Sequence, residues 1–305
     1  MKSTSLDKRI YNDIQELKQV INGNSQAEIT AAKNLNSVFK VGVNISECFS
    51  TKGLPSYYFG DRESTTVFVN LNPGMNARDC DGNLNVDIHN FNHSSTEAFI
   101  QDYHKRQVNY GKNFGLKKNG EADEFDVKQA AFLTSWTDSG IGLPIAPDWS
   151  DKDFCREAKT KVICNKLQLE LIPYASAKFN INKISDISAL YPYVDTLIEE
   201  IFSKERTYII FAADVFDKIF KHYNKHNAMP KVYFEFIGNE EKYRLKKRCA
   251  RCRVVKIHYD GRVTLALIAH TLPSQSLCRA FDLMQSYGKF CYEQFMIAMS
   301  ATTNN

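Results

Sequence analysis

VFVNLNPGMN, residues 67–76, is the stretch on which the fold of this chain depends. Its apolar, β-branched start predicts a buried strand, which ends abruptly in a turn formed by Asn72, Pro73 and Gly74. Proline disfavours the helical conformation for Asn72, and Gly74 permits a sharp turn or a close approach of backbone to a ligand. Because ligands bind at the carboxyl ends of strands in open α/β sheets, this turn is a candidate site. A strand followed by a plain turn is the alternative for this stretch alone.

Length and composition indicate a globular protein. A chain of 305 residues that is 43% hydrophobic and 24% charged can bury a large core, and a net charge of +4 does not by itself indicate a nucleic-acid partner. No apolar run approaches the roughly 20 residues of a membrane span, and the first residues lack the apolar core of a signal peptide. We therefore expect a cytoplasmic monomer without a membrane partner.

The eight cysteines are scattered and do not have the dense spacing of a disulfide framework, so reduced thiols are the simplest interpretation. Cys249 and Cys252 form a lone C-x-x-C, whereas a structural zinc site normally needs a second pair of ligands. Cys278 or His258 would complete such a site only by an accident of folding. We predict no metal and no cofactor.

Hydrophobic periodicity and turn residues predict an alternation of helices and strands. Helices are expected over 5–22, 26–39, 95–108, 125–136, 150–163, 185–204, 214–223 and 277–300. Strands are expected over 67–71, 166–172, 206–213, 231–237, 254–259 and 263–269, with Gly53–Gly60 as a loop before the first of them.

This order predicts a three-layer α/β/α fold with a mainly parallel central sheet, because strand, helix, strand connections favour right-handed crossovers. Asp260-Gly261 is a two-residue hairpin signal, so an antiparallel hairpin should extend the sheet. We expect one domain over residues 1–305, in which 1–56 form an N-terminal helical layer. Residues 76–150 form an inserted region that would build the walls of a pocket.

A second motif lies about two hundred residues after the first. The strand over 263–269 ends at His270, and the sequence continues as Thr-Leu-Pro-Ser-Gln-Ser into the last predicted helix. Ser274 and Ser276 would then lie at a helix N-terminus, which is suited to binding a phosphate.

The two motifs in this order resemble those of the uracil-DNA glycosylase superfamily. Its Gly-x-Asn-Pro-Gly motif is similar to Asn70-Leu71-Asn72-Pro73-Gly74, and its His-Pro-Ser motif is similar to His270-Thr271-Leu272-Pro273-Ser274. The strand that leads to Leu171-Ile172-Pro173-Tyr174 also looks like the second core strand of that family. The resemblance covers about residues 57–300, with a diverged insert. Asn70 replaces the usual glycine, and two extra residues separate His270 from Pro273.

The resemblance implies a role for each motif. Asn72 would orient the attacking water, and His270 would donate a hydrogen bond to the departing base. Ser274, Gln275 and Ser276 would hold a DNA phosphate. The flipped base would enter a pocket walled by an aromatic side chain, with Trp136, Phe132 and Tyr57 as candidates. The pocket residues implied by the resemblance are Asn70, Leu71, Pro73, Gly74, Met75 and Trp136.

Each role has a plainer structural alternative. Asn72 could cap a turn, His270 could be a hydrogen-bonded core histidine, and Ser274 could be an ordinary helix cap. Tyr57 could simply pack in the core.

A basic stretch precedes the strand that carries His270. It contains Lys242, Arg244, Lys246, Lys247, Arg248, Arg251, Arg253 and Lys256. We expect Lys246, Lys247 and Arg248 to contact the DNA backbone, although a charge run is more often only a solvated strand edge.

Three functions fit the sequence. The first is a monofunctional DNA glycosylase that acts on uracil or another damaged or modified base, in repair or in defence against modified foreign DNA. The second is a non-catalytic nucleic-acid-binding module on the same fold, and the third is a nucleoside or nucleotide N-glycosidase. The third would leave the basic stretch without a role.

Overall fold

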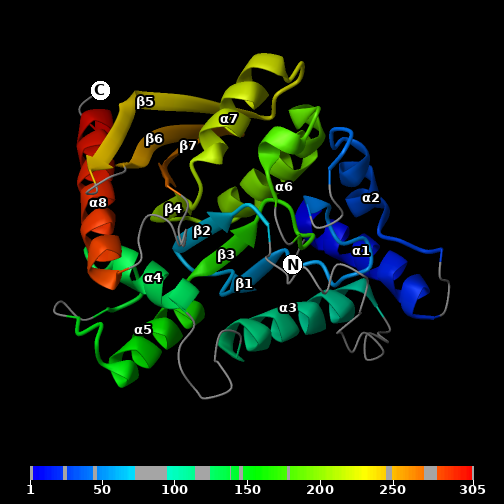
Figure 1. Cartoon of the computed structure of the whole chain (residues 1–305), viewed down its shortest axis with the longest axis horizontal. Helices are drawn as coiled ribbons and strands as arrows, with labels where there is room; N and C mark the ends of the chain where they lie inside the picture. The colour runs from blue at the N-terminus through cyan, green and yellow to red at the C-terminus, as the bar shows by residue number, and fades with distance from the viewer. Residues whose placement is uncertain are drawn as a thin grey trace.

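A single mixed sheet runs through the middle of the molecule (Figure 1). This computed structural model describes residues 3–22, 26–43, 47–72, 95–113, 124–137, 139–143, 147–176, 179–244, 249–270 and 280–303. The strands of these residues follow the order β1-β3-β2-β4-β7-β6-β5. The central strands are parallel: β3 (Leu167–Glu170), β2 (Thr66–Asn70), β4 (Tyr208–Phe211) and β7 (Arg262–Ala269). Strands from both halves of the chain therefore belong to one sheet.

Antiparallel strands complete both sides of the sheet. β5 (Val232–Arg244) and β6 (Cys249–Tyr259) form the predicted hairpin extension on β7. The turn between β6 and β7 has positive φ at Asp260 (49°) and Gly261 (70°), as a type I′ hairpin turn requires. On the other side, β1 (Tyr58–Gly60) pairs antiparallel with β3, so the end of the predicted 53–60 loop is in fact a strand.

Helices cover both faces of the sheet and confirm the three-layer α/β/α prediction. Because side chains alternate along a strand, Val67 and Val69 enter one core and Phe68 enters the other. The first core is closed by α1 (Ser5–Ile21), α2 (Thr30–Ser37), α6 (Tyr191–Phe202) and α7 (Val215–His226), and the second by α4 (Glu124–Leu133), α5 (Lys152–Asn165) and α8 (Phe281–Thr303). α3 (Thr96–Asn113) packs against α1, β1 and α5, and two short 3-10 helices span Ile181–Lys183 and Ile187–Leu190.

Several helix boundaries differ from the predicted ones. α5 begins after Asp151. The Asp151 carboxylate accepts a hydrogen bond from the backbone N–H of Asp153 at 2.9 Å, so the N-cap is Asp151 and not Ser150. α3 continues to Asn113, beyond the predicted end at residue 108. The helix expected from 185 begins only at Tyr191, because a 3-10 turn precedes it. None of the described helices is long and apolar enough to cross a membrane.

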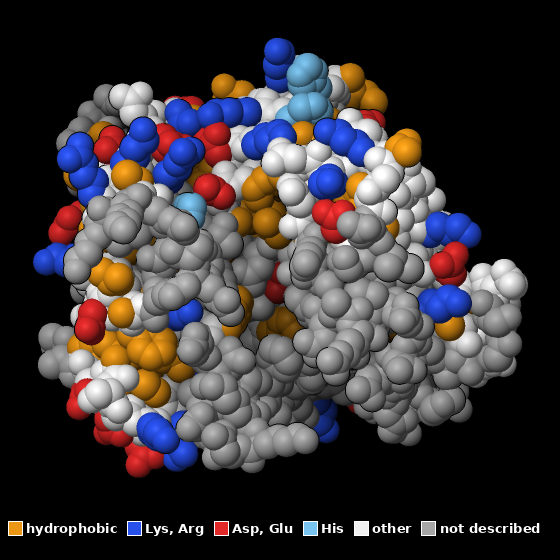
Figure 2. Space-filling view, viewed as in Figure 1, with side chains coloured by type: hydrophobic (Ala, Val, Ile, Leu, Met, Phe, Trp, Pro, Cys, Tyr) orange, Lys and Arg blue, Asp and Glu red, His pale blue; other side chains and the backbone are white. Residues whose placement is uncertain are grey.

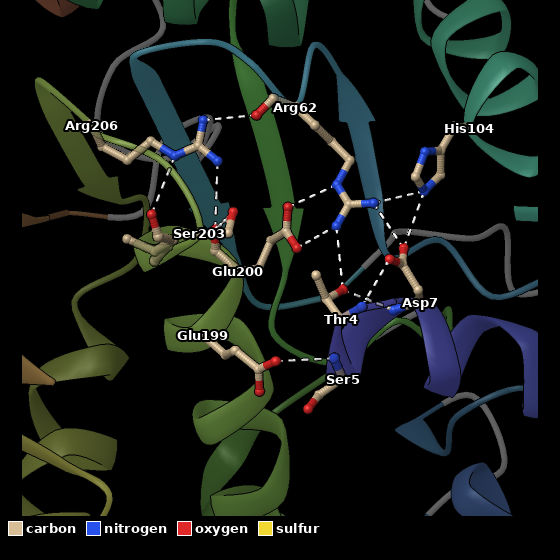
Figure 3. Close-up of polar contacts among 10 residues, drawn as sticks. Thr4, Ser5, Asp7, Arg62, His104, Glu199, Glu200, Ser203 and Arg206 are labelled. Atoms are coloured by element: carbon tan, nitrogen blue, oxygen red, sulfur yellow. Dashed lines mark hydrogen bonds and ion pairs between the residues drawn. The ribbon is translucent and has the colours of Figure 1, made fainter. Parts of the chain in front are cut away.

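An ion-pair cluster ties the N-terminal helix to the sheet at the amino ends of the parallel strands (Figure 3). Arg62, between β1 and β2, pairs through Nε with Glu200 at 2.7 Å and through Nη1 with Asp7 at 2.8 Å. His104 of α3 contacts the same Arg62 nitrogen at 2.7 Å. Thr4 caps α1 and donates its backbone N–H to Asp7. Three helices therefore share one guanidinium, and we interpret the cluster as a structural clamp.

Candidate functional site

The two halves of the predicted site lie at the same edge of the sheet. Val69, Phe211 and Ile268 are aligned across β2, β4 and β7, so the residues that follow these strands leave the sheet together. Asn72 follows β2 and His270 follows β7, with β4 between them. Two strand spacings correspond to about 10 Å, which is wide enough for a base to lie between the two side chains.

Asn72 is held by a hydrogen bond from its side-chain Nδ2 to Ser176 Oγ, at 2.9 Å. Ser176 is itself buried. Ser176, in the segment that follows β3, therefore helps to orient the Asn72 side-chain amide, and the turn after β2 does not do so alone.

His270 is oriented by two contacts. Its backbone N–H donates to the Tyr287 hydroxyl at 2.7 Å, and its Nδ1 lies 3.3 Å from Asp214 Oδ2. The contact with His270 lowers the pKa of Asp214 although burial acts in the opposite direction. A carboxylate at Nδ1 leaves Nε2 as the ring nitrogen available to a ligand, which is a common arrangement for a functional histidine.

A third polar group lies at this edge and was missed by sequence reasoning. Glu170 ends β3 directly beside Asn70, and Asn70 Nδ2 donates to Glu170 Oε1 at 3.1 Å. Gln168 Nε2 donates to the same oxygen at 2.9 Å. The other oxygen, Oε2, is buried and has no hydrogen-bond partner among the described residues. Because burial outweighs the two hydrogen bonds and the field of Lys166, the pKa of Glu170 is raised to about 7.

Glu170 is the end of a buried polar ladder along one face of β3. Lys166 Nζ donates to Asp126 Oδ1 and to Gln168 Oε1, both at 2.9 Å, and to Gln129 Oε1. We define the polar ladder as Asp126, Lys166, Gln168, Glu170 and Asn70. The signal was present in the sequence, because Lys166, Gln168 and Glu170 alternate with the leucines of the opposite face.

The basic hairpin reaches the same edge as His270. Cys252 pairs with Ala269, so the residues of β6 before Cys252 extend beyond the end of β7. Lys242, Arg244 and Arg251 are exposed on this extension, and the Arg251 backbone oxygen accepts a 2.5 Å hydrogen bond from Tyr287. Figure 2 shows Lys and Arg side chains gathered over β5 and β6.

Three cations of the basic stretch form ion pairs among the described residues, and the first is Arg251, which lies 3.6 Å from Glu240. Arg253 pairs with Asp217 at 3.1 Å, and Lys256 pairs with Glu235 at 3.5 Å. Lys246, Lys247 and Arg248 lie outside the described residues.

The aromatic candidates for the pocket wall are core residues. Trp136 is buried, donates to the Gly288 backbone oxygen at 3.1 Å and packs on Tyr208 at the amino end of β4. This is the edge opposite Asn72, so the prediction that Trp136 lines the pocket is corrected. Phe132 stacks on Trp136, and the Tyr57 hydroxyl donates to buried Asp13.

The remaining predicted residues divide into two groups. Leu71 packs against the first core, on the face opposite Asn70. Pro73, Gly74, Met75, Ser274, Gln275 and Ser276 lie outside the described residues. The visible face is hollowed near its middle, over the carboxyl ends of β2 and β3, and acidic and hydrophobic side chains are seen within this hollow (Figure 2).

No group of three potential metal ligands occurs among the described residues. Cys249 is exposed and Cys252 is buried, as expected for residues three apart on a strand. In comparisons with protein-family models, curated proteins and solved structures, no match to this chain was found.

Proposed function

We propose that the chain is a monofunctional DNA glycosylase, which hydrolyses the N-glycosidic bond of a flipped-out uracil or another damaged or modified base. The observation that carries this proposal is the convergence of Asn72, His270 and the basic hairpin at one edge of a parallel sheet. The likeness of both motifs to those of the uracil-DNA glycosylase superfamily supports the same reading.

The proposed reaction needs positioning more than strong proton abstraction. As the bond between C1′ and the base breaks, positive charge develops on the sugar and negative charge on the base. Asn72, fixed by Ser176, holds water for attack on C1′. In the form that carries a proton on Nε2, His270 donates a hydrogen bond from this nitrogen to the base, where negative charge develops.

DNA binding in this proposal comes from the hairpin. Lys242, Arg244 and Arg251 lie beside His270 and would contact phosphates, which fixes the position of the strand without reading its sequence. The residues Ser274 to Ser276 would add a phosphate contact. We propose that the protein acts as a monomer in the cytoplasm, in base repair or in defence against modified foreign DNA.

The test is a panel of oligonucleotides, single-stranded and duplex, that carry uracil or other modified bases. Incubation with the protein should produce abasic sites, which alkali converts to strand breaks. DNA binding without abasic sites on any substrate would instead indicate a binding module. Release of bases from free nucleosides, with no reaction on DNA, would indicate a nucleoside hydrolase.

A further inference from the structure

We infer that Glu170 is the proton donor of the candidate site and delivers its proton from Oε2 to the departing base. This inference rests on the proposed glycosylase function and adds to it a third catalytic residue. None of the motifs that suggested the function contains this residue.

The position of Glu170 is the first argument. It is the last residue of β3 and the direct neighbour of Asn70, the last residue of β2. Both side chains face the same side of the sheet, because one donates to the other at 3.1 Å. A base held beside Asn72, over the end of β2, would therefore lie next to this pair, with β4 between the base and the strand that carries His270.

The hydrogen bonds of Glu170 are the second argument. Oε1 accepts hydrogen bonds from the side-chain amides of Asn70 and Gln168. An oxygen that accepts two such bonds is the one that carries no proton. Oε2 is buried without a partner among the described residues. A buried oxygen without a partner is energetically unfavourable, and such groups occur where a ligand or a reaction requires them. The proton of the neutral acid thus belongs on Oε2.

The surroundings of Glu170 are the third argument. Lys166 is the charged side chain that acts on it, and this favours the ionised form. The same ammonium is paired with Asp126 of α4, which offsets part of its field. The neighbours Asn70 and Tyr57 are neutral. The backbone oxygen of Tyr57 accepts a hydrogen bond from the backbone N–H of Glu170. Burial therefore dominates, and the raised pKa of about 7 keeps a protonated population at neutral pH.

The proton-transfer step balances without a further reactant. When the C1′–N bond breaks, its electron pair goes to the base, and the proton on Oε2 passes to a nitrogen or oxygen of that base. Glu170 is left as a carboxylate. Water forms the new bond to C1′, and the proton that it loses returns to Glu170 through solvent. The sum is the addition of one water across one bond.

The experiment measures single-turnover base release from oligonucleotides that carry the base found in the panel, from pH 5 to pH 9. The wild-type rate should fall about tenfold per pH unit above pH 7. Glu170→Gln should lower the rate at pH 6 by about 100-fold or more and remove this dependence on pH. Glu170→Asp should retain a pH-dependent rate. Glu205→Gln removes an exposed carboxylate before β4, at the opposite edge, and should behave as the wild type.

A leaving-group comparison separates proton donation from packing. If the protein releases uracil, the same oligonucleotide is prepared with 5-fluorouracil in its place. 5-Fluorouracil is a better leaving group than uracil, so its release depends less on proton donation by the enzyme. Glu170→Gln should then lose at least tenfold less activity with 5-fluorouracil than with uracil. For a base other than uracil, the pH profile decides. If Glu170→Gln does not fold, Gln168→Leu is the alternative variant. It removes a hydrogen bond to the Glu170 carboxylate, which should raise the pKa of Glu170 and move the fall in rate to higher pH.

The two proposals fail in different ways. A wild-type protein that releases no base from any substrate overturns both of them. An active wild type whose rate and pH profile are unchanged by Glu170→Gln overturns the role of Glu170 alone. Unchanged rates with an altered choice of base also overturn it, because Glu170 would then read the base without protonating it.

Discussion

At the scale of single residues, the position that matches the motif and the position that departs from it have different hydrogen-bond partners. Asn72 retains the amide that the water-holding role requires and is fixed by Ser176. Asn70 occupies the place of a glycine and is engaged by Glu170. The departure therefore comes with a partner on the next strand, which argues for a pocket of altered polarity and against a simple loss of the motif.

Replacement of Asn72 by Ala should remove base release and leave DNA binding intact. The expected loss is about 100-fold or more in single-turnover rate, because the attacking water loses its hydrogen-bond partner. Asn34→Ala, at an exposed position of α2, is the control. Asn70→Gly should instead change which bases are released. A wild-type rate in the Asn72 variant would exclude the proposed role of the amide.

Glu170 should also make stability depend on pH. Its folded-state pKa of about 7 lies above the usual 4.5, so the stability it contributes is full below pH 4.5 and is lost as the pH rises through 7. The free energy of unfolding of Glu170→Gln, relative to the wild type, should increase by about 2–3 kcal/mol between pH 4.5 and pH 8. Urea unfolding at the two pH values measures this difference. An equal difference at both would show that Glu170 titrates normally.

At the scale of elements, sequence patterns predicted the parallel central strands and the antiparallel extension, whereas β1 was not predicted and β5 and β6 are longer than expected. The parallel core strands and the hairpin at Asp260-Gly261 follow from runs of apolar residues bounded by strong turn signals. The predicted helix starts were less accurate, since Ser150 and Asp151 are both good caps and only tertiary packing selects one. The place of Trp136 was not predictable, because an aromatic residue on a helix gives no indication of which end of the sheet it will meet.

The hairpin should determine the salt dependence of DNA binding. Each phosphate contact that is removed lowers the slope of log K against log salt by about 0.9. The triple change of Lys246, Lys247 and Arg248 to Ala should therefore lower the slope by about 2–3, and Lys242→Ala with Arg244→Ala by about 1–2. Fluorescence anisotropy of a labelled oligonucleotide measures both slopes.

The matched control is Lys231→Ala, an exposed lysine immediately before the other end of β5. Its slope should equal that of the wild type. Unchanged slopes in both hairpin variants would mean that DNA binds elsewhere.

At the scale of the whole molecule, the two edges of the sheet carry different kinds of polar groups. The carboxyl ends of the strands carry groups whose hydrogen-bonding capacity is incompletely used, such as Glu170 Oε2. The amino ends carry the clamp around Arg62, where both carboxylates are paired (Figure 3). If the carboxyl edge binds the base as proposed, substitutions at the amino edge should affect stability without changing which base is released.

The clamp should contribute to resistance against acid. Burial alone would raise the pKa of Asp7, but the hydrogen bond from His104 and the charge of Arg62 lower it well below the usual 3.8. Its contribution is therefore present above about pH 4 and is lost as the pH falls further. Asp7→Asn should unfold at a higher pH than the wild type during acid titration followed by circular dichroism. The exposed Asp153→Asn should leave the acid midpoint unchanged.

Arg62→Met should be more damaging than either carboxylate change. It leaves Glu200, whose side chain is 1% exposed, without its cation, and loss of one partner of a buried pair costs about 3–5 kcal/mol. Urea unfolding at pH 7 measures the loss. A loss below 1 kcal/mol would show that the clamp is dispensable.

The polar ladder has a consequence for how this protein can change over evolutionary time. Its members form hydrogen bonds with one another inside the core, so the loss of Lys166 alone would leave Asp126 and Gln168 short of a partner in a buried position. A lineage can therefore abandon the ladder only by several substitutions at once or through a destabilised ancestor. We expect descendants of this chain to inherit Asp126, Lys166, Gln168 and Glu170 together or to replace all of them with apolar residues. A search for distant relatives could use this joint pattern in place of either short motif.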